Sequence, residues 1–283
     1  MAKLKNTLII GLGMMGGSLC RSIKNNKVSE KISAYDTNKK SLDYALKNKM
    51  IDHAVYDYKS IPNPDLIIIC TPLSSYLDIV KQILASVNNK TIITDIGSSK
   101  GIIHNKVTKL VNTTNCTFLS SHPMVGSECS GIKNHTKDLY NNKVVFLIDK
   151  HRTSKATYTK VRNFWKSIGA LTYDIDSKKH DLLMSQTSHI AHLMAYIFMG
   201  SLPQSAIDKK NLPLLLGGGI REHVRLSKSN PKMWTDIFIN NKSNILKSLA
   251  RIQKNTLDFK KLIESLDEEN IYSLLEKIHI KTK

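Results

Sequence analysis

The stretch Thr7-Leu-Ile-Ile-Gly11-Leu-Gly13-Met-Met-Gly16-Gly17 decides the fold of this chain. A short apolar run, typical of a buried strand, leads directly into a G-x-G-x-x-G turn that opens a helix. In such a turn the first glycine permits the tight bend, the second lets a pyrophosphate approach the backbone, and the third lets the helix pack on the strand. The phosphates would lie at the helix N-terminus, where unpaired N–H groups favour anions.

An acidic residue at a suitable spacing supports a dinucleotide site. Asp36 lies 20 residues after Gly16 and ends a second predicted strand, Lys31–Tyr35. A carboxylate there suits the two ribose hydroxyls of NAD and repels the 2′-phosphate of NADP. A purely structural glycine turn is the alternative interpretation. The sequence therefore predicts NAD as cofactor, with contacts from Gly11, Gly13, Met14, Met15, Gly16 and Asp36.

Short apolar runs continue to alternate with helical patterns as far as Ile148. Such an alternation is typical of a parallel sheet covered on both faces, so we expect a Rossmann-type, doubly wound α/β domain. Thr71 and Pro72 follow one apolar run, at the edge of the sheet where ligands bind, and are predicted cofactor contacts; a plain loop is the alternative. The predicted strands after Tyr35 are Leu66–Cys70, Thr91–Thr94, Thr117–Leu119 and Lys143–Ile148.

The pattern changes near Thr172, after which no strand signal is convincing. We expect a dinucleotide-binding domain over residues 1–173 and an all-helical domain over 174–283, beginning with one long helix from Ser177 to Leu202. Because so small a helical domain would expose apolar residues, we expect a homodimer. The apolar stretches concerned are Leu182–Met184, Leu193–Met199 and Leu212–Leu216.

Composition restricts the class of protein. The net charge is +19, but the 42 basic residues comprise 36 scattered lysines and only 6 arginines, which does not resemble a nucleic-acid reader. A general lysine bias or anionic substrates would explain the charge. No apolar stretch is long enough to span a membrane, and the apolar run at the N-terminus is too short for a signal peptide. Four cysteines without C-x-x-C spacing favour the cytoplasm.

Three polar clusters are candidates for chemistry. His122 follows a predicted strand and is well placed for proton transfer, with a pKa expected in roughly the 6–7 range, although a lone histidine is often structural. Ser185, Ser188, His189 and His192 would share one helix face, which could also be a solvated stripe. No suitably spaced carboxylate accompanies these histidines, so no metal site is expected.

The third cluster contains two of the six arginines and one of the two tryptophans. Arg221 and Arg225 follow Gly217–Gly219, and Trp234 lies shortly after them. Arginine suits a bidentate grip on a carboxylate, so these two arginines are candidates for binding one; surface ion pairs are the alternative.

Taken together, these motifs resemble the prephenate/arogenate dehydrogenase family of tyrosine biosynthesis. The matching stretches occur in family order over nearly the whole chain. They are GLGMMGGSL, D-x-G-S-x-K at Asp95–Lys100, S-H-P-M-x-G-x-E at Ser121–Glu128, S-H-x-x-H at Ser188–His192, and G-G-x-R-x-x-x-R with P-x-M-W-x-D-I at Gly218–Ile237.

The resemblance implies NAD-dependent oxidative decarboxylation of an anionic cyclohexadienyl carboxylate. His122 would accept the proton of the ring hydroxyl, and Ser98 would hydrogen-bond that hydroxyl. Arg225 would pair with a substrate carboxylate. The other implied substrate contacts are His192 and Ser188 at the side chain, Trp234 closing the pocket or bracing Arg225, and also Ser127 and Gly218. The helical domain would form the dimer, so some of these groups could cross between subunits.

The chain departs from the family pattern at two positions. Glu222 stands where the family usually has Asp, and the longer side chain could change how Arg225 is held. Ala191 replaces a frequent proline between His189 and His192, which should let the helix run straight.

Several alternatives remain open from the sequence. Prephenate is the favoured substrate, since no acid in the S-H-x-x-H stretch would pair with the ammonium of arogenate; arogenate dehydrogenase and a dual-substrate enzyme are the alternatives. Another Rossmann-plus-helical oxidoreductase, such as a hydroxyacid or pyrroline-carboxylate reductase, lacks the H-P-M-x-G motif. A non-enzymatic NAD-sensing or nucleic-acid-binding protein is the most distant possibility.

Overall fold

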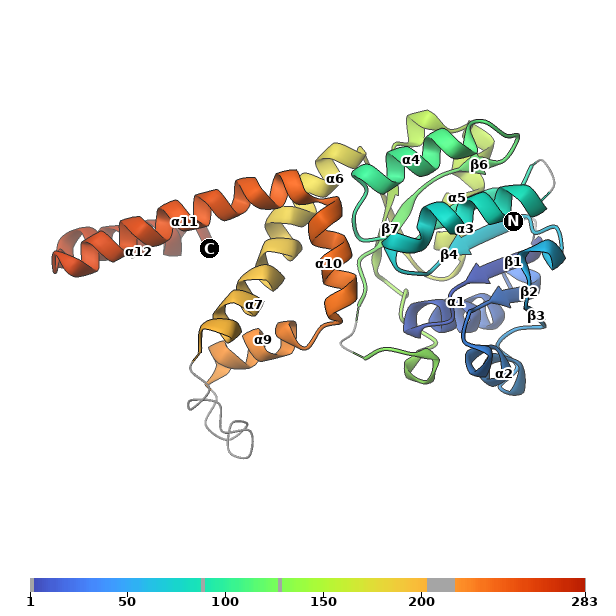
Figure 1. Cartoon of the computed structure of the whole chain (residues 1–283), viewed down its shortest axis with the longest axis horizontal. Coiled ribbons are helices and arrows are strands. Elements are labelled where there is room, and N and C mark those ends of the chain that lie inside the picture. Colours follow the sequence, from blue (N-terminus) through green and yellow to red (C-terminus); the bar gives the residue numbers. More distant parts are fainter. Residues whose placement is uncertain (1–2, 88–89, 127–128, 203–216, 283) are drawn as a thin grey trace.

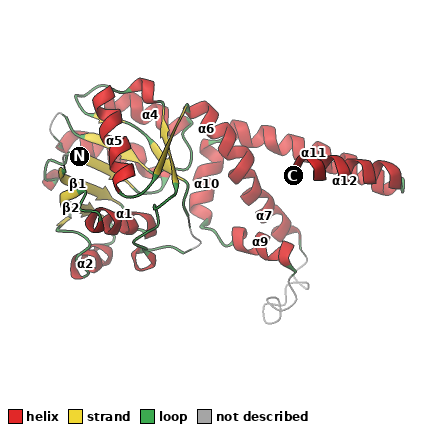
Figure 2. Ribbon diagram, turned by 180° about the vertical axis from the view of Figure 1, so that it is seen from behind, coloured by secondary structure: helices red, strands yellow, loops and turns green. Residues whose placement is uncertain are grey.

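The computed structural model describes residues 3–87, 90–126, 129–202 and 217–282. An α/β part contains all strands of these residues, and a helical part projects from one side of it (Figures 1 and 2). The elements of the α/β part that precede the second sheet are β1 (Leu4–Ile10), α1 (Met14–Asn25), β2 (Ser29–Tyr35), α2 (Lys39–Lys47), β3 (His53–Val55), β4 (Leu66–Ile69), α3 (Tyr76–Ser86), β5 (Ile92–Asp95), α4 (Ile102–Val111) and β6 (Thr117–Phe118).

The main sheet has six parallel strands in the order β3-β2-β1-β4-β5-β6. This is the Rossmann order, and it confirms the fold class predicted from the sequence. The chain changes direction along the sheet between β1 and β4, so the carboxyl ends of these two strands flank the crevice in which such sheets bind ligands. β3 was not predicted, because three residues carry little periodic signal.

Side chains of the central strands point alternately into two apolar cores. Leu8 and Ile10 of β1 belong to one core with Tyr76 of α3, whereas Ile9 belongs to the other core with Leu19 of α1. Both faces of the sheet are therefore buried, which is why these strands read as continuous apolar runs.

A second, three-stranded sheet lies beside the first and was not foreseen as a separate unit. It consists of β7 (Ser121–Pro123), β8 (Val144–Ile148) and β9 (Leu171–Ile175), with β8 antiparallel to β7 and parallel to β9. Helix α5 (Lys155–Ser167) connects β8 to β9. The expectation of no strand beyond Thr172 was wrong, because β9 is largely exposed and its apolar signal is weak.

The helical part begins with three consecutive helical segments. They are α6 (Ser177–Met184), a π-helical segment (Ser185–His189) and α7 (Ile190–Ser201), where the sequence predicted one uniform helix. The elements that follow are α9 (Gly218–Ser227), α10 (Pro231–Asn240), α11 (Lys242–Glu264) and α12 (Glu268–Thr282).

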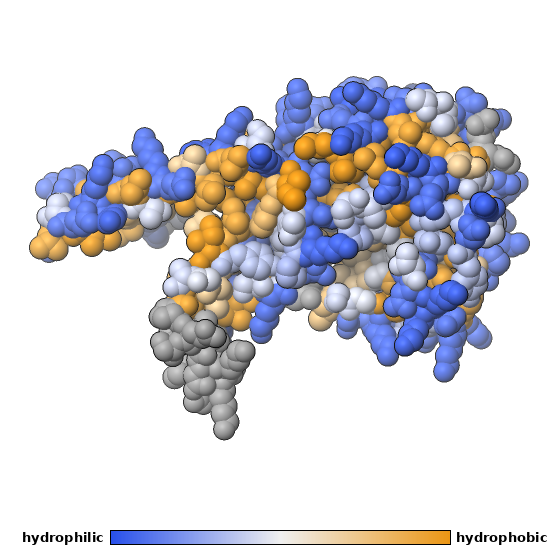
Figure 3. Space-filling model, in the orientation of Figure 1, coloured by the Kyte–Doolittle hydropathy of each residue, from blue (hydrophilic) through white to orange (hydrophobic). Residues whose placement is uncertain are grey.

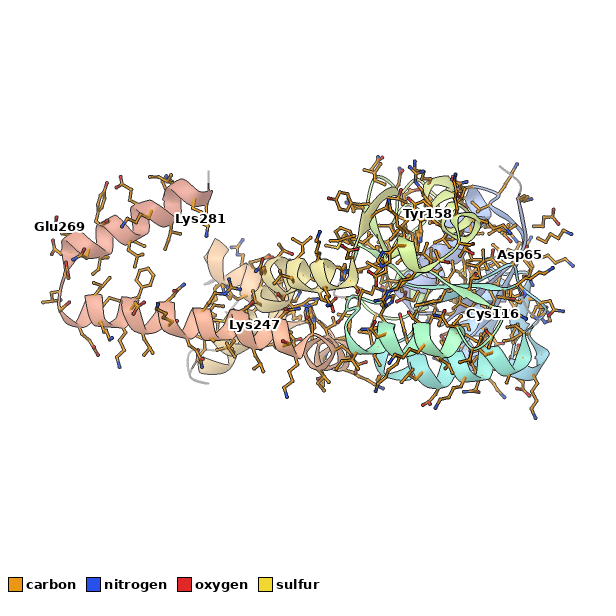
Figure 4. All side chains as sticks on the ribbon, turned by 90° about the horizontal axis from the view of Figure 1, so that it is seen from above. Asp65, Cys116, Tyr158, Lys247, Glu269 and Lys281 are labelled. Atoms are coloured by element: carbon orange, nitrogen blue, oxygen red, sulfur yellow. The ribbon has the colours of Figure 1, made fainter. Side chains whose placement is uncertain are left out.

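Helices α11 and α12 form an antiparallel arm that extends away from the rest of the chain. In Figure 4, Lys247 lies near the base of the arm, Glu269 at its tip and Lys281 on the returning helix. Over the described residues, no helix is both long enough and apolar enough to cross a membrane.

Two of the three motif glycines in the turn cannot be replaced by a larger residue without a steric clash. Gly11 has a φ of +97°, which favours glycine, and a Cβ there would lie 2.9 Å from Thr71 Cγ2. A Cβ on Gly16 would lie 1.9 Å from the carbonyl oxygen of Gly11, an impossible contact, whereas a Cβ on Gly13 would meet no atom within 4 Å. Gly16 therefore serves the packing of α1 on β1, and Gly13 leaves open space beside the backbone.

These two glycines should respond oppositely to the same substitution. Gly16→Ala should lower the melting temperature by several degrees or prevent folding, since the backbone of the turn must move. Gly13→Ala should change the free energy of unfolding by less than about 1 kcal/mol, because its φ of −73° suits alanine. The added methyl group of Gly13→Ala would lie in the open space that NAD phosphates would occupy. This variant should therefore bind NAD more weakly than the unmutated protein, as measured by calorimetry. Equal stability of both variants would contradict the distinct roles assigned to Gly13 and Gly16.

Candidate active site at the junction of the two parts

The N-terminus of α1 is prepared for an anion. No side chain caps it, its first turn has no acidic residue, and Gly13 is the capping residue. Its N–H groups therefore face the open space beside Gly13, which fits a pyrophosphate.

Asp36 lies directly beside this turn. One of its carboxylate oxygens accepts the N–H of Leu12 at 2.6 Å, and the other accepts the N–H of Asn38 at 2.7 Å. Each carboxylate oxygen can accept a further hydrogen bond, so the group remains able to bind ribose hydroxyls. Thr71 packs against Gly11 from the end of β4, and Pro72 follows it. The structure thus brings Gly11, Gly13, Asp36 and Thr71, four of the predicted cofactor contacts, close together.

A buried ion pair ties the end of β5 to the second sheet. Lys100 Nζ lies 2.7 Å from Asp95 Oδ2 and donates to the carbonyl oxygen of Ser121 at 2.8 Å. Asp95 also accepts the hydroxyl of Ser120 and the N–H of Ser121. The loop that carries Ser98 is therefore attached to the strand that carries His122.

His122 lies within β7, opposite Phe146 of β8, where the sequence predicted a turn after a strand. Only 7% of its surface is exposed, and its Nδ1 lies 2.8 Å from Nε2 of His180. Burial lowers the pKa of His122 well below its usual range, and the nearby His180, Lys100 and His189 lower it further. His122 is therefore neutral at physiological pH, as a proton acceptor must be.

A second group of buried polar residues joins the helical part to the loop after β5. The side-chain amide of Asn241, between α10 and α11, donates to the carbonyl oxygen of Asp181 at 2.7 Å and lies 3.1 Å from His189 Nδ1. His189 also bonds the backbone of Ser98. Burial is the main cause that lowers the pKa of His189 to about 4.

His192 lies farther along α7 and stacks on Trp234 of α10. The ring centroids are 3.8 Å apart with an interplanar angle of 25°, and Nδ1 of His192 lies 3.1 Å from the carbonyl oxygen of Ser188. Burial also lowers the pKa of His192. The indole Nε1 of Trp234 is buried with no hydrogen-bond partner among the described residues. Ser188 and Trp234 are thus both in contact with His192, and we refer to these three residues below as the proposed substrate wall.

Arg225 is bound by Glu222 on the exposed face of α9. Arg225 Nε donates to Glu222 Oε2 at 2.9 Å, and Arg225 Nη2 donates to the other oxygen. This bidentate pair lowers the pKa of Glu222. The longer Glu222 side chain therefore still holds Arg225. Gly218 begins α9 and is exposed, and the predicted contact Ser127 lies outside the described residues.

Sequence reasoning missed three buried residues of this junction: His180, Asp181 and Asn241. The adjacent His180-Asp181 pair near the start of a predicted helix was an available signal, since both residue types are rarely buried without partners. Asn241 gave no signal, because it lies between two polar residues at a break between helices.

One group of described side chains outside the site could approach a metal ion: Asp149, His151 and Asp176. Two of the three are exposed, and the carboxylate of Asp149 already accepts the N–H of Ser177 and pairs with His104. The group carries no further conclusion.

Comparisons with known proteins agree with this geometry. The family model described as "Prephenate dehydrogenase, nucleotide-binding domain" matches residues 19–174, and "Prephenate dehydrogenase, dimerization domain" matches residues 176–277. The chain belongs to the prephenate dehydrogenase family. The resemblance drawn from the motifs is thereby confirmed, and this family member is an NAD-dependent oxidoreductase, as predicted.

Individual relatives cover nearly the whole chain. It is 28% identical to prephenate dehydrogenase of Bacillus subtilis, over 96% of this chain and 74% of the relative, and 26% identical to cyclohexadienyl dehydrogenase of Zymomonas mobilis, over 98% and 93%. The crystal structure of prephenate dehydrogenase from A. aeolicus with hydroxyphenyl propionate and NAD+ superposes with a TM-score of 0.90 at 28% identity, covering 99% and 98% of the two chains.

Because the buried histidines of this site are neutral, the folded protein should become less stable in mild acid. A group whose pKa is lowered in the folded state stabilises the fold above its unfolded pKa and loses that contribution as pH falls. For His189 this window runs from 6.5 down to about 4. The urea midpoint should therefore fall between pH 7 and 5, with a shallower slope for His189→Gln.

The control for this prediction is His151→Gln, which alters an exposed histidine in the same protein. It should leave the pH slope of the urea midpoint unchanged. An unchanged slope in His189→Gln as well would show that His189 takes up its proton equally in the folded and unfolded states.

Proposed function

We propose that this chain is a prephenate dehydrogenase that converts prephenate to 4-hydroxyphenylpyruvate by NAD-dependent oxidative decarboxylation, in tyrosine biosynthesis. The observation that carries the proposal is the placement of one buried, neutral histidine, His122, where the dinucleotide-binding sheet meets the helical part. The two prephenate dehydrogenase family models match the chain on either side of that junction, over residues 19–174 and 176–277, and support the proposal.

The proposed chemistry assigns His122 the role of general base. The glycine-rich turn, Asp36 and Thr71 would hold NAD, which would supply the acceptor for a hydride from the ring carbon that carries the hydroxyl. His122 takes the proton of that hydroxyl, and Ser98 orients the hydroxyl by a hydrogen bond. The bond to the ring carboxylate then breaks, carbon dioxide leaves, and its electron pair completes the aromatic ring. The ring oxygen regains a proton at the end, so His122 can return the proton it took.

The proposed substrate contacts come from the helical part. Arg225 would pair with a substrate carboxylate, and its guanidinium would have to share itself between that carboxylate and Glu222. His192 and Ser188 would contact the side chain of the substrate, and the indole N–H of Trp234 offers a donor in the same wall.

Prephenate is favoured over arogenate by the state of the acids around this wall. The negative charge of Glu222 is already balanced by the bidentate pair with Arg225, so this carboxylate would attract an ammonium only weakly. Arogenate oxidation, alone or beside prephenate oxidation, is the second candidate, because one relative is a cyclohexadienyl dehydrogenase.

Steady-state kinetics with each substrate test the proposal. The purified protein should reduce NAD when prephenate is added, followed at the NADH absorbance, with kcat/KM for prephenate exceeding that for arogenate. A higher value with arogenate would reassign the substrate, and no reduction with either would overturn the proposed activity.

Replacement of His122 should remove the base without removing the fold. His122→Asn should lower kcat by about 10²–10⁴-fold while NAD affinity persists. Because burial lowers the pKa of His122 well below 6.5, the acid limb of kcat/KM in the unmutated protein should lie at lower pH than the range of roughly 6–7 expected from the sequence. An acid limb that survives in His122→Asn would place the base elsewhere.

Asp36 should decide the choice of cofactor. Asp36→Ser should lower the ratio of kcat/KM with NAD to kcat/KM with NADP by about 10–100-fold. The ribose of NAD would lose one charged hydrogen bond, and the 2′-phosphate of NADP would no longer be repelled by a carboxylate. Asp36→Asn is the matched control, because it keeps an acceptor near Leu12 and removes the charge. Comparable kcat/KM with NAD and NADP in the unmutated protein would sink this assignment.

We also propose a homodimer formed through the helical part. Orange, apolar surface runs along the projecting arm and its base in Figure 3. Of the apolar residues expected to be exposed, Leu182, Leu183, Ile197 and Phe198 are exposed, while Met184 and Ala195 are buried. The other residues of the stretch 193–199 are half-buried, and Leu212–Leu216 lie outside the described residues. Helices α11 and α12 of the arm bury few of their own side chains, so the arm needs a partner surface to be stable. The family description of this region as a dimerization domain supports the proposal.

Substitutions on the arm should separate the subunits. Leu257 and Ile263 of α11 are 57% and 61% exposed, so L257D with I263D should give a monomer by light scattering. Asn255→Asp adds a charge on the same helix and should leave the dimer intact. A monomeric unmutated protein with full activity would contradict the proposal.

We further propose that the protein acts in the cytoplasm, since Cys20, Cys70 and Cys116 are free thiols.

A further inference from the structure

Three buried side chains form a continuous hydrogen-bonded chain behind the proposed base. Nδ1 of His122 lies 2.8 Å from Nε2 of His180, and Nδ1 of His180 lies 2.8 Å from Oδ1 of Asp181. The exposed fractions of these residues are 7%, 0% and 4%. His122 belongs to the second sheet, whereas His180 and Asp181 lie on α6, so these hydrogen bonds cross the junction of the two parts.

The direction of each hydrogen bond in this chain follows from Asp181. Its Oδ1 also accepts the backbone N–H of Lys100 at 2.8 Å, so that oxygen is an acceptor for two donors. Nδ1 of His180 must then carry the hydrogen that bonds Asp181. In a neutral imidazole the other nitrogen is an acceptor, so Nε2 of His180 accepts from Nδ1–H of His122. The lone pair of His122 is left on Nε2.

We propose that His180 is a positioning residue which, together with Asp181, fixes His122 as the Nδ1–H tautomer and so leaves Nε2 as the proton acceptor. The proposal rests on the proposed function of His122 as general base. Without this chain, the imidazole could carry its hydrogen on either nitrogen, and the Nε2–H form cannot take a proton from the substrate.

The same chain stabilises the imidazolium that forms when His122 takes the proton. A positive charge on His180, Lys100 or His189 would disfavour one on His122, but burial lowers the pKa of His180, so His180 is an uncharged hydrogen-bond acceptor. The groups that face His180 are Asp181 on its own helix, Lys100 and Asp95. Asp181 and Asp95 favour a positive charge there, and Lys100 opposes it. His180 is therefore the neighbour that can accept the Nδ1 hydrogen of His122 with a carboxylate behind it.

The apolar surroundings prevent water from replacing this arrangement. The ring of Phe146, from β8, packs against both imidazoles, with centroids 6.3 Å from His122 and 5.5 Å from His180. Loss of the acceptor on His180 would leave Nδ1–H of His122 buried without a partner, which is costly.

A matched pair of substitutions separates the proposed role from a merely structural one. In His180→Gln, the amide oxygen can accept from His122 and the amide nitrogen can donate to Asp181, which preserves the direction of the chain. In His180→Leu, a residue of similar bulk offers neither. NAD affinity, measured by calorimetry, reports whether the fold persists in both variants.

We expect His180→Leu to lower kcat about 100-fold or more, with KM for prephenate and Kd for NAD within about threefold of the unmutated values. Its acid limb should move to lower pH, because the imidazolium of His122 loses its acceptor. His180→Gln should restore kcat to within about tenfold of the unmutated protein. Equal losses in folded Gln and Leu variants, or an unchanged pH profile in the Leu variant, would overturn the proposal.

Nitrogen NMR of the histidine rings provides a readout that does not depend on turnover. In the unmutated protein with NAD bound at pH 7.5, His122, assigned by the signals lost in His122→Asn, should show protonated Nδ1 and unprotonated Nε2. The opposite tautomer would overturn the proposal even if the enzyme were fully active. If neither prephenate nor arogenate were oxidised, the proposed function would fail while the tautomer measurement still decided the arrangement, also where His180→Leu did not fold.

Discussion

The site depends on the buried ion pair between Asp95 and Lys100. The two side chains are 3% and 1% exposed, and their charged atoms lie 2.7 Å apart. Burial is the largest influence on Lys100 and lowers its pKa, while Asp95 and Asp181 oppose that shift. Loss of one partner from such a pair typically costs about 3–5 kcal/mol, because the other charge is left buried and alone. Lys100 also bonds Ser121 and, through its backbone, Asp181. One residue thereby connects β5, β7 and α6, the elements on or next to which Ser98, His122 and His180 lie.

This arrangement leaves the histidines of the junction uncharged in neutral solution. Burial lowers the pKa of His122, His180, His189 and His192 alike. An anionic substrate would then find its opposite charge at the rim, on Arg225, and a neutral base inside. A charged His122 could bind an anion but could not accept a proton, so the low-polarity surroundings that cost folding energy serve the proposed reaction.

The parts of the structure that the sequence predicted are those whose physical cause is local. Gly11 and Gly16 indicate a turn that a larger residue could not form without moving the backbone, and the apolar runs of β1, β4 and β5 follow from burial on both faces of the sheet. β7 and β9 exist because β8 pairs with them, and neither has an apolar pattern of its own. Asn241 acts through partners far away in the sequence, so no spacing rule could have marked it, whereas the adjacent His180-Asp181 pair offered a signal but not its partner His122. The roles of His122, Ser98 and Arg225 came from the resemblance and remain predictions.

The π-helical segment shows how a local rule failed at a functional position. A regular helix would place Ser185, Ser188, His189 and His192 on one face. A π-helical turn holds one more residue than an α-helical turn of about 3.6 residues, which rotates the helix that follows by about 100°. Ser185 and His189 are buried against the junction, whereas His192 is only half-buried and stacks on Trp234. The π-helical segment ends at His189, and the rings of His189 and His192 both lie near Trp234, with centroids 6.0 Å and 3.8 Å from that of the indole. The widened turn therefore changes the direction of Ser185 relative to the two histidines and does not separate the histidines from each other, a change that a regular spacing rule cannot predict.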